Sequence, residues 1–208
     1  KQMKKMNTPF HGKYASSALL AFLLLWFVPR AGIAQDCYSI ADGNWQDASN
    51  WANTSGGTSP CTNAANNSYP ESGEFARIET TIFVRTNTTV GTLTLANNAR
   101  STLDGADLTV ENDLTINTGS RLSNSSTSLL DIVNSSIIDV DGNIDLDGGI
   151  IIARKDDPGS EGELQVAGDF ANDGNFNPFS VGNSRPATVT FDGGGAQSVT
   201  GSSDFTGG

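Results

Sequence analysis

Short apolar runs recur along the chain from about residue 76, rich in β-branched residues and mostly alternating with polar ones. Such a period of two predicts β-strands. We expect them at residues 82–84, 93–95, 108–110, 114–116, 138–140, 144–146, 150–152, 164–166 and 189–191. Asn, Asp and Gly separate the runs and predict turns. No window beyond residue 34 has a helical period, so the pattern predicts an all-β protein.

The predicted strands also follow a repeating pattern. Residues 108–119 align with residues 138–149 at an offset of 30, and residues 164–176 follow the same scheme at a further offset of 26. Repeats of this length are typical of solenoids, in which each repeat buries its apolar side chains by stacking on its neighbours. We therefore predict a parallel β-helix, that is, a β-solenoid. The alternative is an antiparallel β-sandwich, whose short strands are spaced in a similar way.

Residues 1–34 have the pattern of an export signal rather than of a folded domain. Four lysines precede an apolar run of 11 residues, Ala18–Val28, and Gly32-Ile33-Ala34 then offers small residues to a signal peptidase. A membrane-spanning helix needs about 18 or more apolar residues. We therefore predict a signal peptide over residues 1–34 and no membrane span after its cleavage; a membrane anchor or a buried core helix is the alternative.

Cleavage would change the charge and the chemistry of the chain. Five of the 12 Lys and Arg residues lie in residues 1–34, whereas all 23 Asp and Glu residues lie beyond them, which leaves a net charge of −16. So acidic a chain repels nucleic-acid phosphates and anionic membranes. The one histidine, His11, lies in the predicted signal. The mature protein would therefore have neither a His-based catalytic triad nor a His-ligated metal.

Residues 35–75 differ in composition from the rest and predict a compact N-terminal cap. They contain both cysteines, Cys37 and Cys61, and both tryptophans of the mature chain, Trp45 and Trp51. Two cysteines in an exported chain most simply form one disulfide; a pair of free thiols is the alternative. The polar residues 52–68 predict a loop.

Four motifs resemble those of large secreted surface proteins of Bacteroidetes that are built from β-helix repeats. Residues 42–51 (DGNWQDASNW) are similar to their G-N-W start, and residues 90–95 (VGTLTL) to their V-G-x-L-x-L unit. Residues 166–176 (VAGDFANDGNF) and 187–201 (ATVTFDGGGAQSVTG) resemble two units that usually follow one another in such proteins. The resemblance covers roughly residues 40–208.

The resemblance implies a right-handed parallel β-helix that is exported and often very long. Such proteins frequently end in a sorting domain for type IX secretion and attachment to the cell surface. Here the last residues, 204–208, follow directly on a repeat unit, without a sorting domain. We therefore expect residues 76–208 to be solenoid repeats of a chain that is truncated at its C-terminus.

An acidic run, Asp139, Asp141, Asp145 and Asp147, alternates with apolar residues and encloses Asn143. Alternation along a strand places Asp139 on the outer face. Calcium takes six to eight oxygen ligands, so these five side chains, with backbone carbonyls, could hold a calcium ion. The alternative is a solvated outer face that keeps the protein soluble and its edges unpaired. We expect no other cofactor.

Two further hypotheses concern sugars. Trp45 and Trp51 could form a platform for sugar rings; alternatively, they cover the end of the solenoid and shield its core from water. Paired carboxylates in the acidic run could serve a polysaccharide hydrolase, which uses one carboxyl group of raised pKa beside an ionised one. The sequence shows no fixed geometry for such a pair.

These features together predict a non-enzymatic structural or adhesive β-helix segment of a bacterial protein that is secreted or displayed at the cell surface. Its partner would be an extracellular glycan, a matrix or a neighbouring cell, and not a nucleic acid. We expect the segment to be monomeric or part of a longer chain. The alternative is an accessory or catalytic module that acts on extracellular polysaccharide, of the lyase or glycoside hydrolase type.

Overall fold

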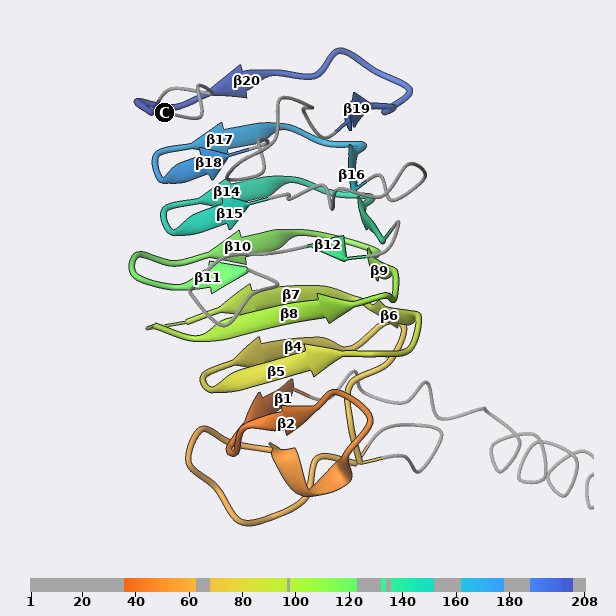
Figure 1. The fold of residues 1–208 in the computed structure, drawn as a ribbon, viewed down its shortest axis with the longest axis vertical. Coiled ribbons are helices and arrows are strands. Elements are labelled where there is room, and N and C mark those ends of the chain that lie inside the picture. The colour runs from red at the N-terminus through yellow and green to blue at the C-terminus, as the bar shows by residue number, and fades with distance from the viewer. Residues whose placement is uncertain are drawn as a thin grey trace, which may run out of the picture. The chain divides into compact units, whose positions relative to one another are not determined.

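Three sheets of short strands make up nearly all of the secondary structure (Figure 1). The structure is a computed structural model, and it describes residues 36–62, 68–96, 98–122, 132–133, 136–151, 162–177 and 188–203. The predicted signal peptide, residues 1–34, lies outside the described residues. In the described part of the chain, no helix is long and apolar enough to cross a membrane.

Sheet A has eight strands in the order β20-β17-β14-β10-β7-β4-β1-β3. Their bounds are Val199–Thr200, Phe170–Asn172, Ile144–Leu146, Leu114–Ile116, Thr92–Leu95, Phe75–Ile78, Asp36–Ser39 and Trp51–Ala52. A single turn of 3₁₀ helix, Ala48–Asn50, directly precedes β3. β1 and β3 pair antiparallel, whereas every other described pair in sheet A is parallel.

Sheets B and C are parallel throughout their described pairs. Sheet B has the order β18-β15-β11-β8-β5-β2, with β12 beside β8; the bounds are Asn175–Asn177, Gly149–Ile151, Arg121–Leu122, Arg100–Asp104, Thr81–Val84, Gly43–Asn44 and, for β12, Ile132–Val133. Sheet C has the order β19-β16-β13-β9-β6; the bounds are Thr188–Phe191, Glu163–Val166, Ile137–Val140, Leu108–Val110 and Thr88–Val90.

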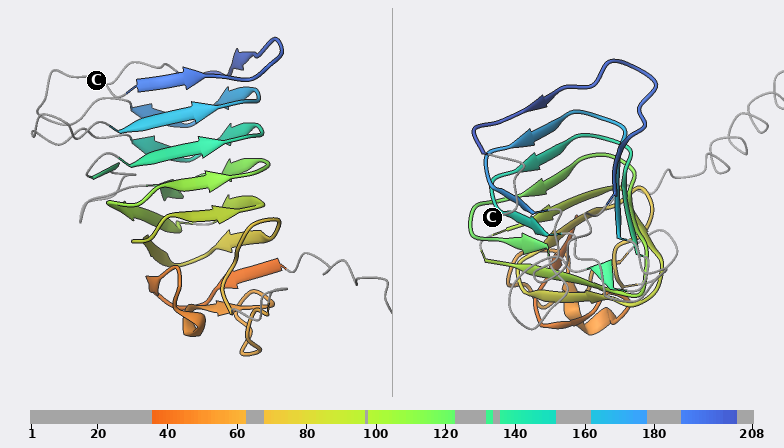
Figure 2. Two further views of the ribbon diagram at one scale, coloured as in Figure 1. Left: turned by 90° about the vertical axis from the view of Figure 1, so that its right-hand side faces the viewer. Right: turned by 45° about the horizontal axis from the view of Figure 1, so that its top comes forward.

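From β4 onward the chain visits sheets A, B and C in turn, and we call one such passage a rung. Figures 1 and 2 show the rungs lying one above another in sequence order. The fold is therefore all-β with mostly parallel sheets, an arrangement compatible with a β-solenoid. The alternative of an antiparallel sandwich is wrong, because antiparallel pairing of the described strands is confined to β1 and β3 in the N-terminal region.

The register of the strands confirms the repeats that the sequence indicates. Ile138 pairs with Leu108 on one side and with Leu164 on the other, at the predicted offsets. Ile144 likewise lies between Leu114 and Phe170. The repeat therefore corresponds to one rung.

Apolar side chains at equivalent positions of successive rungs form continuous ladders inside the molecule. One ladder in sheet A runs through Ile78, Leu95, Ile116 and Leu146, which are paired in register and fully buried. A strand of three or four residues has too few contacts to be stable alone. The ladders supply the missing contacts, because each apolar side chain packs on its counterpart in the next rung.

Glycines at the corners let the rungs stack closely. A Cβ atom on Gly168 would lie 2.4 Å from the carbonyl oxygen of Gly142, and one on Gly142 would lie 2.4 Å from that of Asn112. On the sequence alone, the triplet Asp141-Gly142-Asn143 is explained by the preference of these residue types for turns. At Gly142, however, the structure shows that glycine is required by the close approach of the neighbouring rung.

Candidate functional site

The predicted disulfide is present. Cys37 in β1 and Cys61 are bonded, with Cα atoms 5.4 Å apart, and both residues are fully buried. Cys61 follows an isolated antiparallel bridge between Ala52 and Pro60. The bond therefore ties the end of a polar loop to the first strand of sheet A.

Trp45 and Trp51 lie in the core beside this disulfide. Their exposed fractions are 0% and 1%, and their ring centroids are 5.0 Å apart. Each indole N–H is satisfied internally: Trp45 donates to the carbonyl of Pro70 at 2.9 Å, and Trp51 donates to the carbonyl of Trp45 at 2.7 Å. Because both rings are buried, neither offers a face to a sugar in this structure.

The acidic run does not lie on one face of one sheet. Asp139 belongs to β13 of sheet C and Asp145 to β14 of sheet A, with a corner between them. The structure thus places Asp139 and Asp145 on different sheets, and a calcium site formed by Asp139, Asp141, Asn143, Asp145 and Asp147 stays a prediction. In the described ranges, no group of three or more His, Cys, Asp or Glu residues could hold a metal ion. The alternating pattern of the sequence does not reveal the corner that separates Asp139 from Asp145.

Asn143 belongs to a chain of hydrogen bonds that crosses the rungs. The Asp113 carboxylate accepts a hydrogen bond from the backbone N–H of Asn143 at 2.8 Å. The Asn143 side-chain oxygen accepts one from the N–H of Asp169, and the Asp169 carboxylate accepts one from the N–H of Ser198. We call these residues the Asx ladder. It satisfies corner N–H groups that no strand pairs.

Asp139 is the acidic residue with the most distinctive surroundings. It lies on the outer face of sheet C, as its alternation in the sequence predicts. Partial burial raises its pKa, and the nearby carboxylates of Asp141, Asp192 and Glu163 raise it further. Thr190 donates a hydrogen bond to Glu163 at 2.9 Å. A raised pKa beside other carboxylates is one requirement of glycoside hydrolysis, so Asp139 is the residue on which the enzymatic alternative depends.

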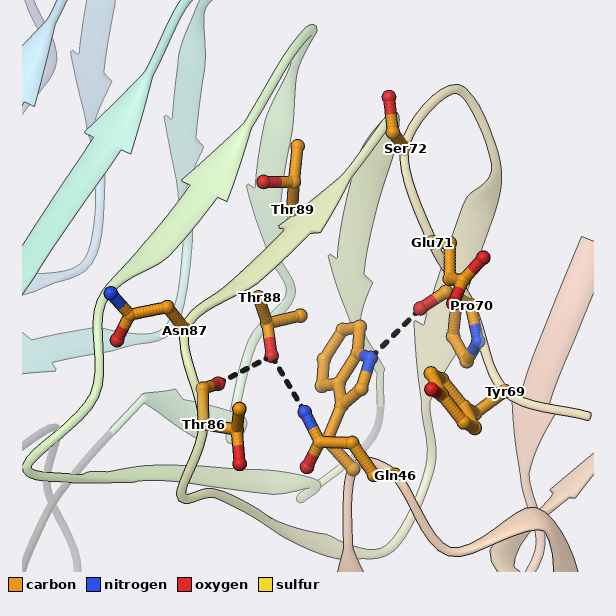
Figure 3. Close-up of a pocket in the computed structure, with 10 residues that line it drawn as sticks. Gln46, Tyr69, Pro70, Glu71, Ser72, Thr86, Asn87, Thr88 and Thr89 are labelled. Atoms are coloured by element: carbon orange, nitrogen blue, oxygen red, sulfur yellow. Dashed lines mark hydrogen bonds between the residues drawn. The ribbon is translucent and has the colours of Figure 1, made fainter. Parts of the chain in front are cut away.

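A hollow of ≈ 350 Å³ lies where the N-terminal region meets the first rungs (Figure 3). Three segments line it: Trp45 and Gln46 after β2, residues 69–72 before β4, and residues 86–89 at the start of β6. Hydrogen bonds join these segments. The Gln46 amide donates to the Thr88 hydroxyl at 3.0 Å, and that hydroxyl donates to the carbonyl of Thr86 at 2.7 Å. The walls are therefore held in place without a ligand.

A second hollow of ≈ 330 Å³ adjoins the first and shares Gln46 and Thr86 with it. Its other lining residues are Asn44, Asp47 and Arg85. The Arg85 guanidinium contacts the Asp104 carboxylate at 3.1 Å and lies 5.0 Å from the centre of the Phe83 ring. The long side chain of Arg85 is thus fixed along one wall.

The sequence did not reveal these two hollows. Gln46, Tyr69 and Thr86 are ordinary loop residues in a chain rich in polar loops, and they are up to 40 positions apart. Only the register that pairs Asn44 of β2 with Phe83 of β5 brings the loops together. A repeat alignment could not have found them, because β2 lies before the first regular repeat.

Comparisons of the chain with protein-family models, with curated proteins and with solved structures found no match.

Proposed function

We propose that the chain is an exported, non-enzymatic structural or adhesive segment of a bacterial secreted or cell-surface protein. The observation that carries this proposal is the stacking of rungs in register, with a continuous buried core and polar outer faces. Stacked rungs make a stiff element whose length depends on their number. Such an element suits a stalk or a surface that contacts other molecules.

The outer face of sheet C supports the adhesive role. Thr89, Thr109, Asp139, Gln165 and Thr190 pair in register, one on each of five neighbouring strands. They form a row of hydroxyl, carboxylate and amide groups, spaced by about 4.8 Å, the distance between paired strands. A regular polar row of this kind can form repeated contacts with an extracellular glycan or matrix polymer.

The finer architecture that we propose is a right-handed parallel β-helix. The order of the sheets and the resemblance to β-helix repeat proteins of Bacteroidetes support it. Residues 1–34 would be removed on export, because they combine basic residues, an apolar run and a small-residue site. The intact mass of the secreted protein would test this. A chain beginning at Gln35 supports export by cleavage, whereas a retained leader contradicts it.

The functional test measures attachment and turnover on the same material. The purified full chain is fixed to beads and mixed with bacterial cells or matrix polysaccharide, and both the retained material and the newly released reducing ends are measured. Retention without new reducing ends is the expected result. Beads carrying heat-denatured protein are the control. Steady release of reducing ends would contradict the non-enzymatic proposal.

A catalytic module for polysaccharide is the second candidate, and the raised pKa of Asp139 is the observation that favours it. If Asp139 were a general acid, Asp139→Asn would abolish product release. Asp145→Asn, on the outer face of sheet A, is the matched control. Equal traces of product from both variants and the wild type would remove this candidate.

A further inference from the structure

We propose that the two adjoining hollows form one cleft that binds a short stretch of an uncharged glycan, with one sugar unit in each hollow. This inference rests on the proposed adhesive function and names the chemical class of its ligand. The hollows have nearly equal volumes, ≈ 350 and ≈ 330 Å³, and share Gln46 and Thr86 as their divider. Two like compartments with a common divider suit a ligand of repeating units.

The lining of the cleft has the groups that recognise sugar hydroxyls. Part of their capacity is already used: the Gln46 amide donates to Thr88, the Ser72 hydroxyl donates to Glu111, and the Asn44 side-chain oxygen accepts from Arg85. The Gln46 oxygen and the Ser72 oxygen can still accept from a sugar hydroxyl, and the Asn44 amide nitrogen can still donate to one. The Thr86 hydroxyl can do both. The ring of Tyr69 lies against the core beside Pro70 and lines the first hollow (Figure 3). Hydroxyl and amide groups around one aromatic ring match the alternating polar and apolar surface of a pyranose.

The charges around the cleft favour an uncharged ligand over an acidic one. Among the residues that the structure describes, Glu71 is the one charged residue that lines the first hollow. The second hollow has Asp47 and Arg85, but Asp104 already pairs with Arg85 at 3.1 Å. Hydrogen bonds from Ser49 lower the pKa of Asp47, so this carboxyl group is ionised at neutral pH. The net charge at the cleft is therefore negative, and a glycan of uronic acids would be repelled.

The walls are fixed before any ligand arrives, which lowers the entropic cost of binding. Trp45 holds the loop of residues 69–72 through its bond to the carbonyl of Pro70. Its own backbone N–H donates to the carbonyl of Phe83 in β5 at 2.9 Å. Gln46 spans the cleft to Thr88. One residue pair, Trp45 and Gln46, thus joins all three segments of the site.

Affinity electrophoresis tests the proposal on the full chain. The protein is run in native gels that contain dextran, mixed-linkage β-glucan, galactomannan or xylan, and in gels that contain alginate as the acidic polymer. We expect retardation by at least one uncharged polysaccharide and none by alginate. Retardation by alginate alone, or by none of these polymers, would overturn the proposal.

Two variants locate the binding. Gln46→Ala removes the amide that both hollows share. Thr86→Met places a larger side chain between the two hollows, where it would obstruct the ligand, and keeps the backbone carbonyl that accepts from Thr88. Each should weaken binding by about tenfold or more, the loss of roughly one good hydrogen bond to the ligand. Thr115→Ala, on the outer face of β10 in sheet A, is the control and should bind as the wild type does. Equal retardation of all four proteins would place binding elsewhere and refute the cleft.

Failure of the cleft and failure of the proposed function can be told apart. Thermal melting of each variant shows whether the fold is kept, and reducing ends are measured in the same mixtures. Absence of retardation of the wild type by every uncharged polymer, without product release, refutes the cleft alone. Product release by the wild type refutes the non-enzymatic function, whatever the gels show.

Discussion

The N-terminal region and the rungs that follow β4 are both built from β-strands, but different kinds of contact stabilise them. In the rungs, one contact recurs: a buried side chain packs on its counterpart, as Leu95 does on Ile116. In the N-terminal region each contact occurs once, such as the Cys37–Cys61 disulfide and the bond from Trp45 to Pro70.

The difference teaches where the molecule is sensitive to change. Truncation of one side chain in a ladder leaves similar packing in the rungs above and below it, so the loss of free energy of unfolding is limited by the contacts that remain. Loss of a unique contact in the N-terminal region has no such substitute. That region also holds the two hollows, whose walls depend on the same unique contacts.

The largest effect is expected for Trp45→Ala. The side chain is fully buried, packs against Trp51 and donates to Pro70. Removing it should lower the free energy of unfolding by about 3–5 kcal/mol, the usual cost of a large buried aromatic. Urea denaturation followed by far-UV circular dichroism measures the change. Leu114→Ala in the rungs is the comparator at about 2–5 kcal/mol, and a clearly larger loss for it would reverse the comparison.

The disulfide should have the next largest effect. Its sequence separation is 24 residues, and closing a loop of this size restricts the unfolded chain by roughly 3 kcal/mol. The double variant Cys37→Ala, Cys61→Ala should therefore unfold at a lower urea concentration. Adding a reductant should move the wild type to the same midpoint and leave the variant unchanged. An identical midpoint for all samples would show that the bond contributes nothing.

The sequence predicted the rungs well because the same alternation of apolar and polar residues recurs in them. The run Leu108–Val110 and its relatives alternate with period two, and strands at offsets of 30 and 26 residues pair in register. The disulfide was predictable as well, since the chain has just two cysteines. These features need no knowledge of distant contacts.

The parts that the sequence did not predict depend on corners and on one-time contacts. The carboxylates around Asn143 look like one row in the sequence, but the corner before β14 divides them between two sheets. β8 was missed because Arg100 and Ser101 interrupt its apolar pattern, although β5 pairs with it. The hollows required the register of β2 on β5, which no repeat in the sequence indicates.

The Asx ladder should contribute less than the core. Asn143→Ala removes the acceptor for the N–H of Asp169 and the donor to Asp113, so we expect a loss of about 1 kcal/mol. Asn143→Ser keeps a side-chain oxygen as acceptor without placing a second carboxylate beside Asp113, and should recover part of this loss. Thermal melting measures both variants. If Asn143→Ser were no better than Asn143→Ala, the acceptor would not be the stabilising group.

The smallest effects concern pH, and they should differ in sign between the two regions. Burial and neighbouring carboxylates raise the pKa of Asp139 above the ordinary aspartate value of 3.8, so the folded state binds its proton more tightly than the unfolded chain. The stability that this group contributes is thus present below pH 3.8 and is lost as the pH rises through the folded pKa. Asp139→Asn should stabilise the protein at pH 7 by less than about 1 kcal/mol, because solvent screens the carboxylates.

Asp47 in the N-terminal region should show the opposite sign. The hydroxyl and the backbone N–H of Ser49 lower its pKa, so its contribution to stability is present at neutral pH and is lost as the pH falls through the folded pKa. Asp47→Asn should therefore destabilise the protein at pH 7 and lose this effect in acid. Urea midpoints between pH 2.5 and pH 7 measure both slopes. Parallel pH profiles for the two variants would contradict the prediction. Crossing profiles would show that the two carboxylates act on stability in opposite ways, because Asp47 is solvated and accepts hydrogen bonds whereas Asp139 is crowded by other carboxylates.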